Sequence, residues 1–217
     1  MIKALIFDFD GVIVESVDIK TEAFRELFKD HPEQLEALIE YHLHHGGVSR
    51  VEKIRYFYRE LLRQPLSQDD LNALCERFSD LVVEKVIAAS FVQGAQELLQ
   101  WAKGKFDMHI VSGTPQEEIR EVIGQRKLGS YFTEVFGSPR TKKDIVAEII
   151  SRHHYDPDKV VLIGDAITDL EAAKAHGLAF LARETETSGD WINNEYITGR
   201  FPDLQGVKQW IVKKANS

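Results

Sequence analysis

The chain has 217 residues, of which 43 % are hydrophobic and 29 % are charged, the usual balance of a globular protein. Its 27 basic and 35 acidic side chains give a formal net charge of −8, which argues against a general binder of nucleic acids or anionic membranes. A single cysteine, Cys75, excludes a disulfide framework and a multi-cysteine zinc site. Because no apolar run approaches the roughly 18–20 residues of a membrane span, we predict a soluble, cytoplasmic protein.

The first predicted element is a short buried strand within residues 1–9, which are apolar and rich in β-branched side chains. Two carboxylates, Asp8 and Asp10, end this segment. Over residues 16–90 the pattern changes, because apolar side chains recur at helical spacing and no segment has the character of a strand. A capping pattern typical of a helix start begins at Ser49. We therefore predict an all-helical block inserted after the first strand.

After residue 92, predicted strands alternate with predicted helices. The strands are expected at 108–111, 133–136, 159–163 and 178–181, and the helices from Thr114 onward, over 142–153 and from Thr168 to Gly177. This order predicts an α/β fold with a parallel sheet that helices cover on both faces. The helical block would then interrupt a discontinuous core.

Polar side chains follow three of the predicted strands, and four of these side chains are carboxylates. Because ligands of an open parallel sheet bind at the carboxyl ends of its strands, we expect Asp8, Asp10, Asp165 and Asp169 to converge at one edge. Bringing these like charges together costs several kcal/mol unless a cation neutralises them or protons are taken up. Oxygen-only ligands with room for water and phosphate suit Mg²⁺. The sequence therefore predicts a magnesium site that can also attract an anionic substrate.

Each polar cluster also has a simpler explanation when taken alone. Residues 8–11 could be an acidic turn, residues 112–115 a helix start with proline in the first turn, and residues 164–169 a loop capped by Thr168. The three clusters occur in this order, each at the end of a predicted strand. Together they indicate a functional site.

These clusters resemble the motifs of the haloacid dehalogenase superfamily of aspartate-nucleophile phosphatases, over essentially the whole chain. Residues 8–12 look like the first motif, with Val12 where threonine is commoner, and Ser112 looks like the second. Lys142 looks like the third, and Asp165 with Asp169 like the fourth. The resemblance implies a Rossmann-like core of residues 1–15 plus 91–217 and a helical cap domain of residues 16–90. It also implies Mg²⁺ dependence and a phosphoaspartyl intermediate.

The resemblance assigns roles that are chemically sensible. Asp8 would be the nucleophile, because a carboxylate can attack phosphorus and divide one difficult displacement into two easier ones. Asp10 would be the general acid and base, while Ser112 and Lys142 would neutralise the phosphoryl oxygens. The adjacent Lys143 is the alternative to Lys142, and both lysines could instead be solvated. The metal would be held by Asp8, Asp10 (through its carbonyl), Asp165 and Asp169.

The predicted cap and core loops also supply candidate substrate-binding residues. In the cap, Gly47 lets the backbone approach a ligand closely, and Arg50 and Lys53 lie in the first turn of a helix, where an anion would offset their unfavourable position. Gly113 and Thr114 are the candidates in the core. The cationic pair could equally be solvated, with the glycines only turning the chain.

We therefore predict a Mg²⁺-dependent hydrolase of phosphoric monoesters that acts on a small phosphorylated metabolite of the sugar phosphate or phosphoglycolate type. A phosphomutase is the alternative, because residues 46–50 resemble the corresponding loop of β-phosphoglucomutase. A non-catalytic binding protein is the third. The cluster of His42, His44 and His45 is a weak metal-site candidate, and the pair His153 and His154 is expected to be a polar helix end. No nucleic-acid or membrane partner is expected, and the oligomeric state is not predicted.

Overall fold

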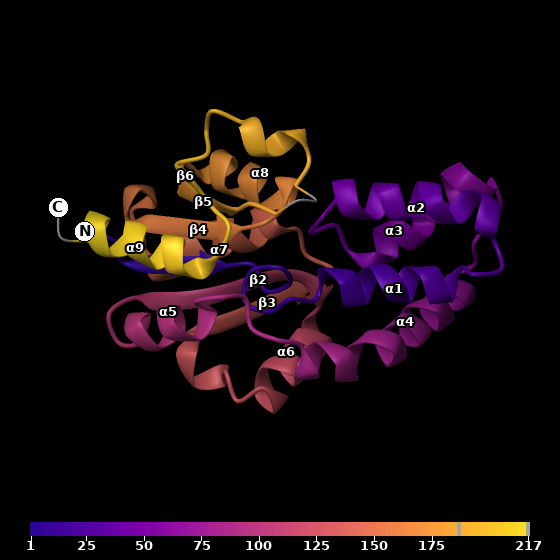
Figure 1. The fold of residues 1–217 in the computed structure, drawn as a ribbon, viewed down its shortest axis with the longest axis horizontal. Helices are drawn as coiled ribbons and strands as arrows, with labels where there is room; N and C mark the ends of the chain where they lie inside the picture. The colour runs from indigo at the N-terminus through magenta and orange to yellow at the C-terminus, as the bar shows by residue number, and fades with distance from the viewer. Residues whose placement is uncertain (186–187, 216–217) are drawn as a thin grey trace.

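The computed structural model describes residues 1–185 and 188–215. Its centre is a six-stranded parallel sheet with the strand order β3-β2-β1-β4-β5-β6 (Figure 1). The strands are β1 (Ala4–Phe7), β2 (Asp107–Pro115), β3 (Glu134–Ser138), β4 (Val160–Gly164), β5 (Ala179–Arg183) and β6 (Gly199–Phe201). Because β1 lies between β2 and β4, the carboxyl ends of these three strands meet at the middle of one sheet edge.

Helices cover both faces of the sheet, as its apolar strands require. On one face, α7 (Lys142–His153) and α8 (Ile167–His176) bury Ile145 and Leu170 in a core that includes Ile6 of β1. On the other face lie α5 (Ala95–Ala102), α6 (Gln116–Gln125) and α9 (Leu204–Ala215). The chain is therefore an α/β protein with a doubly covered parallel sheet, as predicted.

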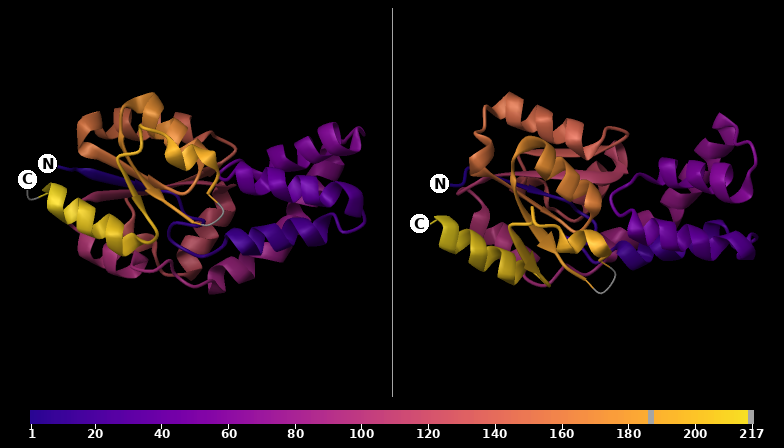
Figure 2. Two further views of the ribbon diagram at one scale, coloured as in Figure 1. Left: turned by 45° about the horizontal axis from the view of Figure 1, so that its top comes forward. Right: turned by 90° about the horizontal axis from the view of Figure 1, so that it is seen from above.

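The part of the chain from α1 to α4, which follows β1, is helical and lies at one end of the core (Figures 1 and 2). It contains α1 (Val17–Leu27), α2 (Pro32–His44), α3 (Arg50–Tyr56), the π-helical turn Phe57–Leu62 and α4 (Gln68–Ala88). The two connections to the core run side by side, since the Glu15 amide donates to the Ser90 carbonyl (2.9 Å) and the Val92 amide to the Ile13 carbonyl (3.1 Å). The inserted helical cap is thus confirmed. The domain boundaries at residues 16 and 90 stay a prediction.

Two predicted helix starts are wrong. The strand β2 continues to Pro115, so α6 begins only at Gln116 and no capping box forms around Thr114. Helix α8 begins at Ile167 after Ala166, and Thr168 is therefore its second residue and not its cap. The two hydroxyl groups that suggested these caps instead donate hydrogen bonds to residues far away in the sequence. Thr114 donates to Asp10, and Thr168 donates to the Gly46 carbonyl. None of the helices in the described part of the chain is long and apolar enough to cross a membrane.

Candidate active site

Three carboxylates meet at the carboxyl ends of β1 and β4. Asp8 follows β1, Asp165 follows β4, and Asp169 lies in the first turn of α8. One oxygen atom of each lies within 4.8 Å of the others. Gly11 permits this approach, because its φ of +73° suits glycine and a Cβ atom there would collide with the Asp165 carboxylate. The predicted convergence is therefore found for these three side chains.

Lys142 is the cation that this cluster contains. It is the first residue of α7, and its Nζ atom lies 2.7 Å from Asp8 Oδ2 and 2.7 Å from Asp169 Oδ1. Burial alone would lower the pKa of Lys142, but the charges of Asp169 and Asp8 raise it above its usual value, so the ammonium stays protonated. The neighbouring Lys143 is exposed. Of the two candidate lysines, only Lys142 reaches the carboxylates.

One ammonium does not neutralise three carboxylates. Burial and then the negative charge of Asp8 raise the pKa of Asp165 well above its usual value. Burial likewise raises the pKa of Asp169 to about 7, despite the opposing charge of Lys142. Asp169 Oδ2 is one of three buried side-chain atoms in the described residues that have no hydrogen-bond partner. An all-oxygen donor set with an unpartnered buried oxygen and surplus negative charge fits a hard divalent cation.

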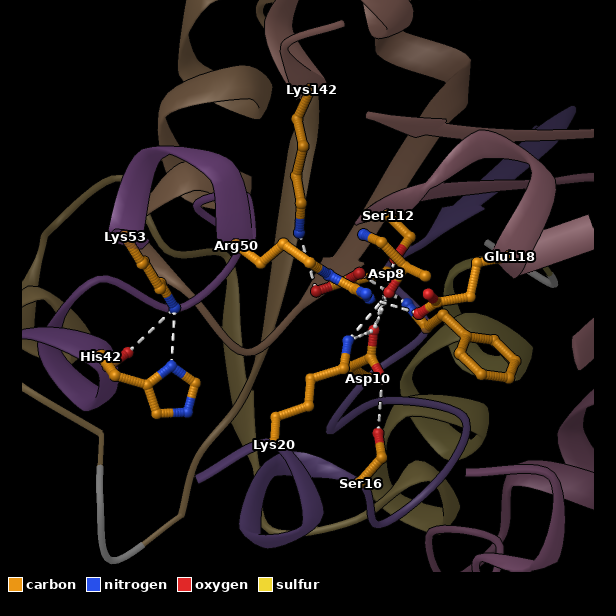
Figure 3. Close-up of polar contacts among 12 residues, drawn as sticks. Asp8, Asp10, Ser16, Lys20, His42, Arg50, Lys53, Ser112, Glu118 and Lys142 are labelled. Carbon is orange, nitrogen blue, oxygen red and sulfur yellow. Dashed lines mark hydrogen bonds and ion pairs between the residues drawn. The ribbon is translucent and has the colours of Figure 1, made fainter. Parts of the chain in front are cut away.

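Asp10 lies in the same cavity but in a different environment (Figure 3). Its Oδ2 atom lies 2.5 Å from Lys20 Nζ and accepts a hydrogen bond from Thr114 Oγ1 (2.9 Å) and a longer one from Ser112 Oγ (3.4 Å). The Ser16 hydroxyl donates to Oδ1 (2.6 Å). Burial would raise the pKa of Asp10, but Lys20 and these donors lower it to about 2. Its side chain does not join the carboxylate cluster, which leaves its backbone carbonyl for the predicted metal contact.

The cap loop at residues 46–48 closes directly over the core. Gly47 has a φ of +78°, and a Cβ atom built there would collide with the Thr168 hydroxyl and lie 3.1 Å from Lys142 Nζ. A Cβ atom on Gly113 would collide with the Gly47 carbonyl. Thr168 Oγ1 donates to the Gly46 carbonyl (3.2 Å). Glycine at these positions lets cap and core backbones touch beside the site.

Arg50 is placed differently from the expectation that it faces a substrate. It lines the cavity, but its guanidinium is buried between the cap and the core, where it forms an ion pair with Glu118 of α6. Arg50 also donates to Ser79 Oγ (2.6 Å), and Ser79 donates to the other Glu118 oxygen (2.7 Å). Arg50 therefore ties α3 and α4 of the cap to α6 of the core. Its predicted contact with substrate remains a prediction.

Lys53 is the cation on the cap side of the cavity whose charge is not paired. It is 4 % exposed, and its Nζ atom contacts His42 Nδ1 (2.8 Å) and the His42 carbonyl (3.2 Å), while no carboxylate among the described residues forms an ion pair with it. Burial, followed by the charges of Lys20 and Lys142, lowers its pKa to about 7. An ammonium held this way faces a cavity of about 350 Å³ that also contains Asp8 and Asp10.

The histidine cluster of the cap does not form a metal site in this arrangement. Burial and the charge of Lys53 lower the pKa of His42 to about 2, so its ring is neutral and accepts from the ammonium. His44 and His45 bond to carbonyl groups of their own helix, those of Glu40 and Tyr41 (both 2.9 Å). His42 therefore accepts hydrogen bonds from Lys53 and holds its side chain in place.

Sequence reasoning missed Lys20, Ser16 and Glu118, and it considered His42 as a metal-site candidate and not as a partner of Lys53. The signal for Lys20 was present, because it lies in the first turns of α1, where a cation opposes the helix dipole. The same argument had singled out Arg50 and Lys53. No comparable signal marked Glu118, whose role depends on a cap residue 68 positions away.

Comparisons with known proteins agree with this geometry. A family model described as haloacid dehalogenase-like hydrolase matches residues 5–183. Phosphoglycolate phosphatase 1 of Pseudomonas aeruginosa is 23 % identical over 185 residues, which cover 81 % of this chain and 67 % of that protein. The phosphorylated carbohydrates phosphatase of Thermotoga maritima is 26 % identical over 186 residues, covering 81 % of this chain and 82 % of that protein. The crystal structure of β-phosphoglucomutase from Clostridium difficile superposes with a TM-score of 0.78 at 18 % identity, covering 100 % of this chain and 98 % of that one.

Proposed function

Because the chain belongs to the haloacid dehalogenase-like hydrolase family, we propose that it hydrolyses phosphoric monoesters of small metabolites through a phosphoaspartyl intermediate on Asp8. The observation that carries this proposal is that two carboxylates in one cavity have different surroundings. Asp8 lies in the carboxylate cluster and contacts Lys142, whereas Asp10 is surrounded by Lys20 and hydroxyl groups. Different environments are how two carboxylates acquire different catalytic roles.

In the first step, an oxygen of Asp8 attacks the phosphorus atom and the bond from phosphorus to the ester oxygen breaks. The leaving oxygen needs a proton, which Asp10 supplies. Asp10 is ionised in the free enzyme, because its pKa is about 2. The negative charge of a bound phosphoryl group beside it, and a shift of Lys20 toward that group, would both raise this pKa. Substrate binding would thus prepare Asp10 as the acid.

In the second step, water attacks the phosphorus atom of the phosphoaspartyl group. Asp10, now ionised again, takes a proton from this water while the bond between phosphorus and Asp8 breaks. Inorganic phosphate is released, and the Asp8 carboxylate is regenerated. In both steps, negative charge on the phosphoryl oxygens requires positioned cations and donors. Lys142, which contacts Asp8, and the hydroxyl groups of Ser112 and Thr114, which donate to Asp10, would supply them.

The carboxylate cluster would hold Mg²⁺ through Asp8, Asp165 and Asp169, together with the backbone carbonyl of Asp10. When bound, the ion would neutralise the phosphoryl oxygens and reduce the repulsion among the carboxylates. The unpartnered Asp169 Oδ2 and the raised pKa of Asp165 support this assignment. We expect chelation to remove activity and Mg²⁺ to restore it.

For the substrate, the cap side of the cavity favours a second anionic group. Lys53 presents a buried ammonium without a carboxylate partner, while Gly47, Gly113 and Thr114 place backbone close to the phosphoryl site. A buried cation is stabilised by an anion that arrives with the ligand. A phosphorylated carboxylic acid fits this demand, as does a sugar phosphate with an acidic group. The P. aeruginosa relative is named for phosphoglycolate, a phosphorylated carboxylic acid, and the T. maritima relative for phosphorylated carbohydrates.

A phosphomutase is the second candidate, because a sugar bisphosphate would also bring a second anion to Lys53. A panel of phosphorylated carboxylic acids, sugar phosphates and sugar bisphosphates, assayed for both phosphate release and isomerised product, distinguishes the candidates. We expect phosphate release with the highest kcat/KM for a compound that has an acidic group besides the phosphate. Isomerisation without net phosphate release would identify a mutase, and neither product from any compound would contradict the proposed catalysis.

A further inference from the structure

A second group of potential metal ligands lies outside the active-site cavity. His109 of β2, Glu134 of β3 and His153, the last residue of α7, each bring one ligand atom to within 4.8 Å of the other two. His109 and Glu134 are register partners on neighbouring strands. Since Lys142 begins the helix that His153 ends, roughly 16 Å of helix separate this group from the catalytic lysine. The proposed chemistry uses none of these three residues.

The hydrogen bonds around His109 define which of its nitrogen atoms carries the proton. The side chain is fully buried, and its Nε2 atom lies 3.2 Å from the Tyr155 hydroxyl. That hydroxyl donates its own proton to Asp107 Oδ2 (2.8 Å), so it accepts from His109 Nε2–H. The ring is fully buried and its centroid lies 5.0 Å from that of the His153 ring, an environment that favours the neutral form with a single proton. Nδ1 is therefore left with a buried lone pair and no proton to donate.

This lone pair points at another acceptor. His109 Nδ1 has no hydrogen-bond partner in the part of the chain that the structure describes, and it faces Glu134 Oε2 at 3.5 Å. The other oxygen of Glu134 is held by Arg152 at 2.5 Å, and Oε2 also contacts His153 Nε2 at 2.8 Å. Two acceptors that face each other, one fully buried and one partly buried, are unfavourable, and a cation between them removes the conflict.

The spacing of these atoms suits a tetrahedral ion. Metal–ligand bonds of about 2.0–2.1 Å at tetrahedral angles place ligand atoms roughly 3.3 Å apart, and the two separations here are 3.5 and 2.8 Å. Two imidazoles and one carboxylate form a ligand set that zinc adopts when it keeps a fourth position for water. His153 is one quarter exposed, which gives that position access to solvent. We propose that His109, Glu134 and His153 form a Zn²⁺ site separate from the carboxylate cluster.

The surroundings of His109 supply the support that such sites require. Ligating histidines commonly donate their second N–H group to an oxygen atom that fixes the ring. Here the Tyr155 hydroxyl does so and is itself held by Asp107, and the Tyr155 ring stacks on His153 with the centroids 5.2 Å apart. A bound ion would join β2 and β3 to the end of α7. We therefore expect Zn²⁺ to stabilise the fold.

The experiment is a Zn²⁺ titration of metal-free full-length protein, followed by calorimetry and by melting temperature, in excess Mg²⁺. We expect one equivalent of Zn²⁺ to bind and to raise the melting temperature. His153→Gln and Glu134→Gln should each weaken Zn²⁺ binding at least tenfold. The neighbouring exposed His154 provides the matched control, since His154→Gln should bind as the unaltered protein does. Because these positions are not fully buried, both altered proteins should fold.

A second variant distinguishes this site from the active site. Asp165→Asn removes one ligand of the carboxylate cluster and should leave the Zn²⁺ equivalent intact. Substitution of Co²⁺ for Zn²⁺ should give the visible absorption of a four-coordinate ion, and His153→Gln should remove it. The proposal is overturned if no equivalent binds, if His153→Gln binds as tightly as the unaltered protein, or if only Asp165→Asn loses the ion.

Discussion

Two deeply buried lysines at the active-site cavity, Lys142 of the core and Lys53 of the cap, have opposite charge environments. In the core, the Lys142 ammonium is shared by Asp8 and Asp169, with a carboxylate oxygen of each at 2.7 Å. On the cap side, Lys53 is as deeply buried, but its Nζ atom has its polar contacts with the ring and carbonyl of His42 and forms no ion pair with a carboxylate in the part of the chain that the structure describes. Paired charges are preorganised for chemistry, whereas an unpaired buried cation destabilises the free protein and is satisfied by a ligand. The core side is therefore suited to catalysis and the cap side to recognition.

The strongest test of the core side is Asp8→Asn. We expect turnover to be abolished, because an amide is a poor nucleophile and carries no charge toward a metal ion. Phosphate release from the best substrate of the panel measures this effect. Asp158→Asn, at an exposed position, is the matched control and should retain full activity. Substantial turnover by a folded Asp8→Asn protein would exclude the covalent mechanism.

The next effect concerns Asp10. Asp10→Asn should slow turnover by about 10²- to 10⁴-fold, since it removes the proton donor and acceptor but leaves the carboxylate cluster in place. The first step should suffer less with p-nitrophenyl phosphate, whose leaving group needs little protonation. Comparison of kcat/KM for an alkyl phosphate and for this ester measures the difference, because kcat/KM does not include the second step. An equal loss for both substrates would argue that Asp10 acts only in structure.

The sequence predicts local elements and strand-end positions in the core better than it predicts contacts between the cap and the core. Helix α7 was predicted with its observed bounds, because Thr141 caps it locally and accepts from the Asp144 amide (3.1 Å). The strand ends predicted the places of Asp8 and Asp165 through the topology of a parallel sheet, whereas Lys142 was indicated by the family resemblance. By contrast, Lys20 and Thr114 meet across 94 positions. Side-chain directions between cap and core depend on packing that local periodicity does not contain.

On the cap side, Lys53→Met should lower kcat/KM for a substrate with a second anionic group by about 10- to 100-fold, or ~1.4–2.8 kcal/mol. Activity toward p-nitrophenyl phosphate, which lacks such a group, should change little. The exposed Lys85 of α4 supplies the control variant Lys85→Met. Equal losses with both substrates would show that Lys53 supports the fold of the site and does not select the substrate.

The same variant should make the ligand-free protein more stable. Burial lowers the pKa of Lys53 from an ordinary value of 10.5 to about 7. Folding is therefore penalised most below pH 7, where the folded protein must keep the ammonium charged, and the penalty disappears as pH approaches 10.5. Lys53→Met should raise the melting temperature most at pH 6–7 and least at high pH. A lower melting temperature across this range would contradict an uncompensated buried charge.

The smallest expected effect concerns the ion pair between Arg50 of the cap and Glu118 of the core. Arg50→Ala and Glu118→Ala should each reduce kcat/KM about 3- to 10-fold, because the ion pair and Ser79 hold the cap loop against the core. If Arg50 acts through Glu118, the double variant should be no worse than the poorer single variant, since interacting residues are not additive. If Arg50 instead binds substrate directly, its loss should persist in the Glu118→Ala background and be larger for the anionic substrate than for p-nitrophenyl phosphate. The cycle thus decides whether Arg50 belongs with Lys53 in recognition or with the contacts that position the cap.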